Sequence, residues 1–182
     1  ALGIMPPYRS VHSAVDMGAS IGMAHGASRA GAFPVLCTIG DSTFAHSGMT
    51  PLLGAVLSDA NITVLILDNA TTAMTGAQDS MASGEQLMEL VRGLGVKDLQ
   101  LIEPLPKNHE ANVAAIKRAI EHEGLSVIVA RRPCIQIKPR KLAEHGHVVK
   151  RLFHRRIAQR KPLLHEVDAQ HGLRRERRAA TL

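Results

Sequence analysis

The sequence predicts an α/β fold with a doubly wound, mostly parallel sheet, because short apolar segments alternate with segments of helical spacing. Three segments rich in Val, Ile and Leu end abruptly at polar residues, as strands buried on both faces do: 35–39, 62–67 and 125–130. Segments with helical spacing separate them, and a connection of that kind joins parallel strands. Helices on both faces of one sheet are therefore expected.

Helices are predicted from spacing and from end signals. The Ala-, Gly- and Met-rich stretch from Gly18 to Gly31 predicts a tightly packed helix. Thr50 and Pro51 predict a helix start, with threonine as the N-cap and proline in the first turn, and this helix is expected to end near Ser58. Two more helices are predicted at 85–92, capped by Ser83 or Gly84, and at 108–123, capped by Asn108, with a short strand at 98–102 between them.

Two stretches lack periodicity and predict loops. Residues 1–15 contain Pro6 and Pro7 and are expected to hold at most a turn of helix or a short strand. Residues 69–83 are polar, and a loop of that length in a compact domain is usually functional or mobile.

The distribution of charge divides the chain into two parts. Residues 1–137 contain 9 Lys and Arg against 12 Asp and Glu, whereas residues 138–182 contain 13 against 4. We therefore expect one folded domain at 1–137 and a basic tail at 138–182 that is partly helical or disordered. Such a tail suits an acidic partner or nucleic acid, but nucleic-acid binding is disfavoured because no aromatic residues alternate with the basic ones.

Several classes of protein are disfavoured by composition. No apolar run reaches 18 residues and no signal-peptide pattern is present, so neither a membrane span nor secretion is expected. Two cysteines, Cys37 and Cys134, make no disulfide framework, and the chain has no CxxC pattern. A cytoplasmic location without a zinc site or iron–sulfur cluster in this chain is expected, with Cys37 as a small buried hydrophobe.

Polar residues follow two of the predicted strands at the point where each ends. Gly40, Asp41 and Ser42 come after the first, and the run from Asp68 to Thr71 comes after the second. Ligands of parallel sheets bind outside the carboxyl ends of the strands. The side-chain oxygens of Asp41 and Asn69 are hard donors that suit Mg²⁺ or Ca²⁺ holding a phosphate group. The simpler interpretation is that Asp41 caps a turn and Asn69 supplies a left-handed loop conformation.

The spacing and flanking residues of these tips carry a family resemblance. Gly40-Asp41-Ser42, then 26 residues, then Asn69 resembles the thiamine diphosphate motif. Four longer stretches resemble the large subunits of indolepyruvate ferredoxin oxidoreductases, in the 2-oxoacid:ferredoxin oxidoreductase family: Met17-Gly-Ala-Ser-Ile-Gly-Met-Ala-His-Gly26, Gly40-Asp-Ser-Thr-Phe-Ala-His-Ser-Gly48, Leu67-Asp-Asn-Ala-Thr-Thr-Ala-Met-Thr-Gly76 and Ala130-Arg-Arg-Pro-Cys134. The similarity covers roughly residues 1 to 135 and corresponds to the diphosphate-binding domain of that family.

The resemblance implies a set of site residues. Mg²⁺ would be bound by Asp41, Asn69 and the backbone carbonyl of Thr71, while Asp68 is left outside the metal site. The cofactor would contact Gly18, Ser20, Ile21, Gly40, Asp41, Ser42, Thr43, Asn69, Thr71, Thr75 and Gly76.

Some of these roles have structural alternatives of similar weight. Ile21 or Met23 would be the apolar support under thiamine, or else part of a plain core helix. His46 would exchange a proton with the reacting group, or else be a surface residue. Thr75, Gly76 and Gln78 match a Thr-Gly-x-Gln pattern of the family, or else form ordinary loop structure. His25 is expected to be structural, and Arg131 and Arg132 to be a solvated strand end rather than an anion site.

The resemblance also implies an activity that this chain would not complete alone. It implies oxidative decarboxylation of a 2-oxoacid, of the aryl-pyruvate type, to an acyl-CoA, with electrons passing through iron–sulfur clusters to ferredoxin. The clusters and the pyrimidine-binding domain would belong to regions or subunits outside this chain, so an oligomer is expected. Residues 77–83 depart from the family pattern. Two alternatives stay open, namely another thiamine-dependent decarboxylase and a degenerate, non-catalytic module.

Overall fold

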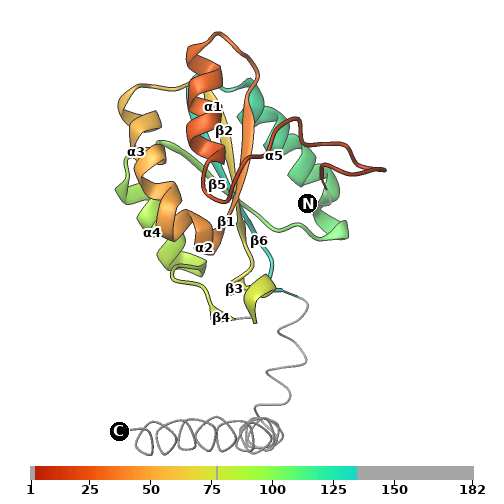
Figure 1. The fold of residues 1–182 in the computed structure, drawn as a ribbon. Coiled ribbons are helices and arrows are strands. Elements are labelled where there is room, and N and C mark those ends of the chain that lie inside the picture. Colours follow the sequence, from red (N-terminus) through yellow and green to blue (C-terminus); the bar gives the residue numbers. More distant parts are fainter. Residues whose placement is uncertain (1–2, 77, 135–182) are drawn as a thin grey trace, which may run out of the picture. The chain divides into compact units, whose positions relative to one another are not determined.

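The computed structural model describes residues 3–76 and 78–134, so the basic segment at 138–182 lies outside the described part. Within these residues, four parallel strands form one sheet, which confirms the predicted fold class (Figure 1). The order across the sheet is β1 (Leu36–Gly40), β2 (Ile62–Asp68), β6 (Leu125–Arg131) and β5 (Asp98–Ile102). The two central strands, β2 and β6, are the longest and most deeply buried, as their near-continuous apolar sequences require.

Helices cover both faces of this sheet (Figure 1). Helices α1 (Ser20–Arg29), α3 (Met49–Leu57) and α4 (Gly84–Gly93) lie on one face, and α5 (His109–Glu121) lies on the other. The larger apolar core lies under the first three helices, and a smaller one lies under α5. Cys37 is 7% exposed in the larger core, which confirms its expected role as a buried hydrophobe.

The helical run after β1 begins earlier than Thr50 and Pro51 indicate. It starts at the strand tip with α2 (Asp41–Thr43), continues through a π-helical turn at Phe44–Gly48 and passes into α3. The predicted N-cap at Thr50 is therefore wrong. Proline cannot donate the usual helical hydrogen bond, and the wider π turn directly before α3 accommodates it inside the run.

Gly48 lies inside this helical run, at the end of the π-helical turn, although glycine is unfavourable in a helix interior. A Cβ at Gly48 would lie 2.7 Å from Cδ2 of Phe44 and 2.9 Å from Cδ1 of Ile39. Glycine is thus required here by close packing of the helical run against β1.

The long loop predicted at 69–83 contains short regular elements. Strands β3 (Thr71–Thr72) and β4 (Gln78–Asp79) form an antiparallel ladder, with a 3₁₀ turn at Ala73–Thr75 between them. Strands of two residues leave no periodicity in a sequence, so the pattern predicted only a loop.

The remaining elements lie where the sequence places them, but their caps differ. Ser83 and Asn108 occupy the N-cap positions of α4 and α5 without a capping side-chain bond. Asn108 Nδ2 donates instead to the carbonyl oxygen and carboxylate of Glu103, at 3.3 Å each. Among the described helices, none combines the length and the hydropathy that a membrane crossing requires.

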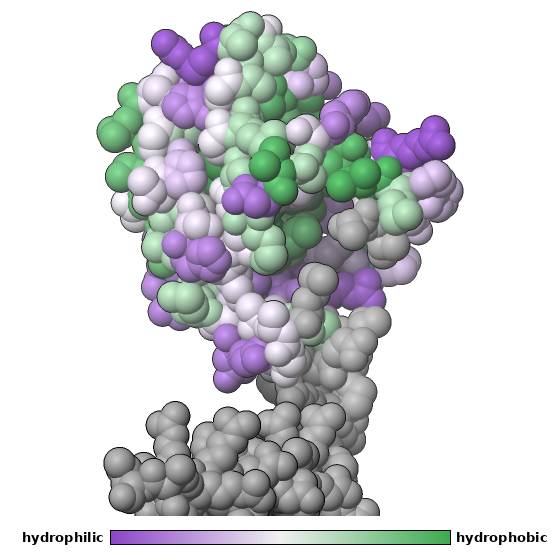
Figure 2. All heavy atoms as spheres, viewed as in Figure 1, coloured by the Kyte–Doolittle hydropathy of each residue, from purple (hydrophilic) through white to green (hydrophobic). Residues whose placement is uncertain are grey.

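Large hydrophobic side chains are also found on the outside of this domain. Val15, Met17, Leu57 and Met81 are each more than two-thirds exposed. The face seen in Figure 2 mixes hydrophobic and polar residues.

Candidate functional site

The tips of β1 and β2 meet at the carboxylate of Asp41. Its Oδ1 accepts a hydrogen bond from Ser42 N at 2.7 Å, and its Oδ2 accepts one from Ala70 N at 2.9 Å. Ala70 directly follows Asn69, so the second of these bonds brings the two predicted metal ligands, Asp41 and Asn69, close together. Asp41 is 3% exposed, so its carboxylate is almost completely shielded from solvent.

Asn69 lies in a tight turn that its own side chain stabilises. Its Oδ1 accepts a hydrogen bond from Thr71 N at 3.0 Å, and its carbonyl oxygen accepts one from Cys134 N at 3.2 Å. The left-handed residue of the turn is Ala70, with φ of 61°. The simpler interpretation, in which Asn69 supplies the left-handed conformation, is therefore wrong.

The electrostatic environment of Asp41 favours a nearby cation. Burial raises the pKa of the Asp41 carboxyl, and the negative charge of Asp68 raises it further, while hydrogen bonds from the backbone N–H groups of Ser42 and Ala70 act in the opposite direction. A divalent cation beside the carboxylate would stabilise its charged form. Each carboxylate oxygen has lone-pair capacity beyond the bond that it already accepts.

The chemistry of the available donors fits Mg²⁺ better than a softer metal. Across residues 3–76 and 78–134, no three His, Cys, Asp or Glu side chains gather as a metal-ligand group. A cation at these tips would therefore depend on the mixed oxygens of Asp41, Asn69 and Thr71. Mg²⁺ accepts few protein ligands because water and phosphate oxygens complete its coordination.

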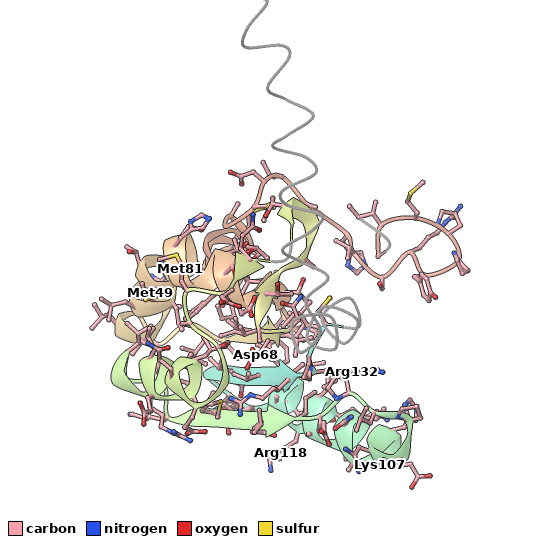
Figure 3. All side chains as sticks on the ribbon, turned by 90° about the horizontal axis from the view of Figure 1, so that it is seen from below. Met49, Asp68, Met81, Lys107, Arg118 and Arg132 are labelled. Atoms are coloured by element: carbon pink, nitrogen blue, oxygen red, sulfur yellow. The ribbon has the colours of Figure 1, made fainter. Side chains whose placement is uncertain are left out.

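The backbone beside these ligands leaves space for a phosphate group. A Cβ built on Gly40 meets nothing within 4 Å, and the helical run starting at Asp41 has its N-terminus at this point. Free N–H groups and the positive end of a helix favour phosphate. Ser42 Oγ donates to Ser80 Oγ at 3.0 Å, which links the tip of β1 to the 69–83 segment. Figure 3 looks onto the strand-tip end, with Asp68 near its centre.

The start of α1 lies against the same helical run. Gly18 has φ of +108°, and a Cβ there would approach Ser47 Oγ to 2.4 Å, so glycine is required. The hydroxyl oxygen of Ser20 is buried and has no hydrogen-bond partner in the described structure. An orphaned buried hydroxyl is a feature that a bound ligand would satisfy.

Other predicted cofactor contacts have purely structural surroundings. Ile21 is 0% exposed within the larger core, as the core-helix alternative expects, whereas Met23 is 37% exposed. Thr43 is buried, and its carbonyl oxygen accepts a bond from Ser47 Oγ at 3.1 Å.

The Thr-Gly-x-Gln match forms a turn in which the Thr75 and Gln78 side chains bond each other's residue. Thr75 Oγ1 donates to Gln78 Oε1 at 2.9 Å, and Gln78 Nε2 donates back to the carbonyl oxygen of Thr75 at 3.1 Å. Gly76, with φ of 127°, lies between them. This geometry agrees with the loop-structure alternative.

The histidines differ in their surroundings. His46 lies in the π-helical turn and is exposed, as the surface-residue alternative expects. His25 Nε2 lies 2.8 Å from Ser58 Oγ, which joins α1 to the end of α3 and supports the structural role expected for His25.

Two features of this region were missed or misjudged from sequence. Arg131 was expected to be a solvated strand end, but its Nε donates to Asp68 Oδ2 at 2.8 Å in a largely buried ion pair. The ion pair could have been predicted only from the fact that Asp68 and Arg131 each end a predicted strand. Residues at the ends of adjacent parallel strands can be register partners, as these two are. Ser80 was not singled out, since nothing local marks it.

These features define a class: a parallel α/β domain whose strand tips bring the side-chain oxygens of Asp41 and Asn69 together beside an open backbone position at Gly40. Comparison with known proteins makes the class specific. The chain belongs to the family described as "Thiamine pyrophosphate enzyme, C-terminal TPP binding domain", whose pattern matches residues 2–130.

Curated relatives narrow the similarity to one kind of subunit. The chain is 35% identical over 158 residues to the indolepyruvate oxidoreductase subunit IorA of Archaeoglobus fulgidus, a match that covers 81% of this chain and 25% of the relative. It is 38% identical over 144 residues to the subunit of the same name from Methanothermobacter thermautotrophicus, which covers 74% and 23%. The chain thus spans about a quarter of the length of these relatives.

A solved structure supports the fold alone. The thiamine diphosphate-dependent 4-hydroxybenzoylformate decarboxylase of Rhodococcus jostii RHA1 superposes with a TM-score of 0.50 at 23% sequence identity. This superposition covers 64% of the present chain and 23% of the decarboxylase.

Proposed function

We propose that this chain is the diphosphate-binding part of a thiamine diphosphate-dependent 2-oxoacid oxidoreductase. The observation that supports this most directly is the hydrogen bond from Ala70 N to Asp41 Oδ2, because it joins the two halves of the thiamine diphosphate motif. Family membership over residues 2–130 supports the cofactor. The names of the relatives support an oxidoreductase subunit.

In this proposal the residues of the strand tips bind and orient the diphosphate end of the cofactor. Asp41, Asn69 and the carbonyl oxygen of Thr71 bind Mg²⁺, which neutralises the diphosphate. Gly40 allows close approach of the backbone. The Ser42 hydroxyl, which donates to Ser80 Oγ in the ligand-free chain, would turn to donate to a phosphate oxygen. When bound, thiamine diphosphate supplies the electron sink that makes decarboxylation of a 2-oxoacid possible.

The substrate and the partners belong to the proposal as well. An aryl-pyruvate such as indolepyruvate is the substrate that the relatives' names support. CoA would take the acyl group, and iron–sulfur clusters outside this chain would pass electrons to ferredoxin. The relatives are named as subunits, and exposed side chains such as Leu57 and Met81 offer contact surface for a partner subunit.

Calorimetry tests the cofactor assignment. Titration of the chain with thiamine diphosphate should release or absorb heat when Mg²⁺ is present, and thiamine without its diphosphate should bind far more weakly. Asp41→Asn should abolish the signal. Asp98→Asn is the matched control, because Asp98 is a half-buried carboxylate at the opposite, amino end of β5. Absence of binding by the unmodified chain would instead favour a degenerate module.

A separate assay tests the substrate. With its partner subunit present, the protein should reduce ferredoxin in a reaction that requires CoA and proceeds faster with indolepyruvate than with pyruvate. Equal rates with both acids would refute the aryl preference while leaving the cofactor assignment intact.

A further inference from the structure

Asp68 and Arg131 form an ion pair that ties together three elements around the 69–83 segment. Asp68 ends β2, Arg131 ends β6, and the two residues are register partners. Arg131 Nε donates to Asp68 Oδ2 at 2.8 Å. The Asp68 side chain is 1% exposed and that of Arg131 is 28% exposed, so the pair is largely shielded from water.

Gly84, the first residue of α4, completes this arrangement. Its N–H donates to the same Asp68 Oδ2 at 2.9 Å, and its carbonyl oxygen accepts a bond from Arg131 Nη2. Asp68 therefore supplies the capping bond for α4 that Ser83 does not make. Both ends of the 69–83 segment are thus fastened to one carboxylate, at residue 68 itself and at residue 84.

The fastened segment carries the residues assigned to the metal. Asn69 follows the pair directly, Ala70 N donates to Asp41 Oδ2, and Thr71 N donates to Asn69 Oδ1. The internal ladder of the segment consists of two residue pairs, so its placement depends on bonds to the rest of the domain. Besides the Asp68 bonds at its ends, these are the bonds from Cys134 N to the Asn69 carbonyl oxygen, from Ala70 N to Asp41 and from Ser42 to Ser80.

Stability alone does not account for a pair of this kind. Replacement of a buried ion pair by well-packed apolar residues is often neutral or stabilising, because desolvation offsets the attraction. Arginine, however, presents several N–H groups in a fixed planar arrangement, which lysine does not. Here Nε and Nη2 point to two different acceptors, Asp68 and Gly84, and this geometry fixes both partners in direction as well as in distance.

We propose that Asp68 and Arg131 are positioning residues, which hold Asn69 and Thr71 where they bind the cation of the diphosphate site. This inference rests on the proposed function. Arg131→Met should weaken Mg²⁺ binding at saturating thiamine diphosphate by about 10-fold or more, as is usual when a group that orients a metal ligand is removed. Arg131→Lys should recover little of this loss, because lysine cannot reach Asp68 and Gly84 together.

A double-mutant cycle separates positioning from general structural support. Because Arg131 is proposed to act through Asn69 as well as Thr71, Arg131→Met should weaken Mg²⁺ affinity by a clearly smaller factor in an Asn69→Ala background than in the unmodified chain. Equal losses in both backgrounds would overturn the inference. Arg92→Met is the matched control, because Arg92 pairs with Glu85 on α4 in an exposed ion pair and should leave Mg²⁺ affinity unchanged.

Amide hydrogen exchange without ligand provides a second measurement, which decides the inference if the Asn69→Ala background binds too weakly to titrate. Exchange in Arg131→Met and Arg131→Lys should accelerate in the 69–83 segment and remain unchanged in β1 and α1. Uniform acceleration, or none, would overturn the inference. Failure of the unmodified chain to bind thiamine diphosphate and Mg²⁺ would overturn the proposed function together with this inference, whereas normal binding by Arg131→Met would overturn the inference alone.

Discussion

Substitution of Asp41 by asparagine should separate the stability of this domain from its ability to bind a cofactor. Asparagine retains one acceptor oxygen, so one of the two N–H groups that now bond Asp41, from Ser42 and Ala70, would lose its acceptor. An unpaired buried N–H costs about 1–3 kcal/mol. Removal of a buried negative charge beside Asp68 acts in the opposite direction. We therefore expect the ligand-free variant to unfold within about 1–2 kcal/mol of the unmodified chain.

The ligand-bound state should respond very differently. Ligand at 100 times its dissociation constant stabilises a protein by about 2.7 kcal/mol. For a domain of this size, each kcal/mol raises the melting temperature by about 2–4 °C, so thiamine diphosphate and Mg²⁺ should raise it by about 5–11 °C. In Asp41→Asn this increase should disappear.

Thermal unfolding with and without the ligands measures both quantities in one series. The control with Asp98→Asn should keep the full ligand-induced increase even if its own melting temperature falls. A ligand-induced increase of normal size in Asp41→Asn would refute the metal-ligand role of Asp41. Loss of the folded state in the ligand-free variant would refute the balance of energies given above.

Three further outcomes are expected. Because burial raises the pKa of the Asp41 carboxyl, this group stabilises the ligand-free fold below its unfolded pKa and loses that contribution as pH rises through the folded pKa. Mg²⁺ affinity should fall as pH falls through the same range, and Asp41→Asn should remove this group's contribution to the pH dependence of stability. Gly18→Ala should destabilise the fold by about 2–4 kcal/mol in chemical denaturation, and Ser47→Gly in the same chain should recover only the part due to contact, because φ of +108° stays unfavourable. Burial raises the pKa of the Cys37 thiol to about 12, so alkylation of the native chain at pH 8 should label Cys134 and spare Cys37, whereas rapid labelling of Cys37 would contradict its burial.

Local patterns identified the strands and most of the helices. The apolar runs at 62–66 and 125–130 are largely buried on both faces in β2 and β6, because a central parallel strand has no polar face, whereas Leu67 at the tip of β2 is exposed. The sequence also indicated that Asp41 and Asn69 would lie close together, since both follow strands of one sheet. The bond from Ala70 N to Asp41 confirms that proximity, while their role as metal ligands stays a prediction.

The predicted helix start at Thr50 was wrong because one local signal can have two physical causes. Thr50-Pro51 resembles a helix start, yet the run begins at Asp41 because a π turn accommodates the proline. The close contact of Gly48 with Phe44 and Ile39, which requires glycine inside this run, has no local signal in the sequence. A proline at a helix start and a proline inside a helical run can be told apart only when the packing of the helix is known.

The sequence by itself determined the fold class, the strand tips that face the candidate site and the family of the chain, because hydrophobic periodicity and motif spacing are properties of neighbouring residues. Only the tertiary structure decided how the 69–83 segment is held. The partners of the Asp68 side chain are Arg131, 63 positions away, and Gly84, 16 positions away. Contacts over such separations depend on strand order and register, which no local pattern contains.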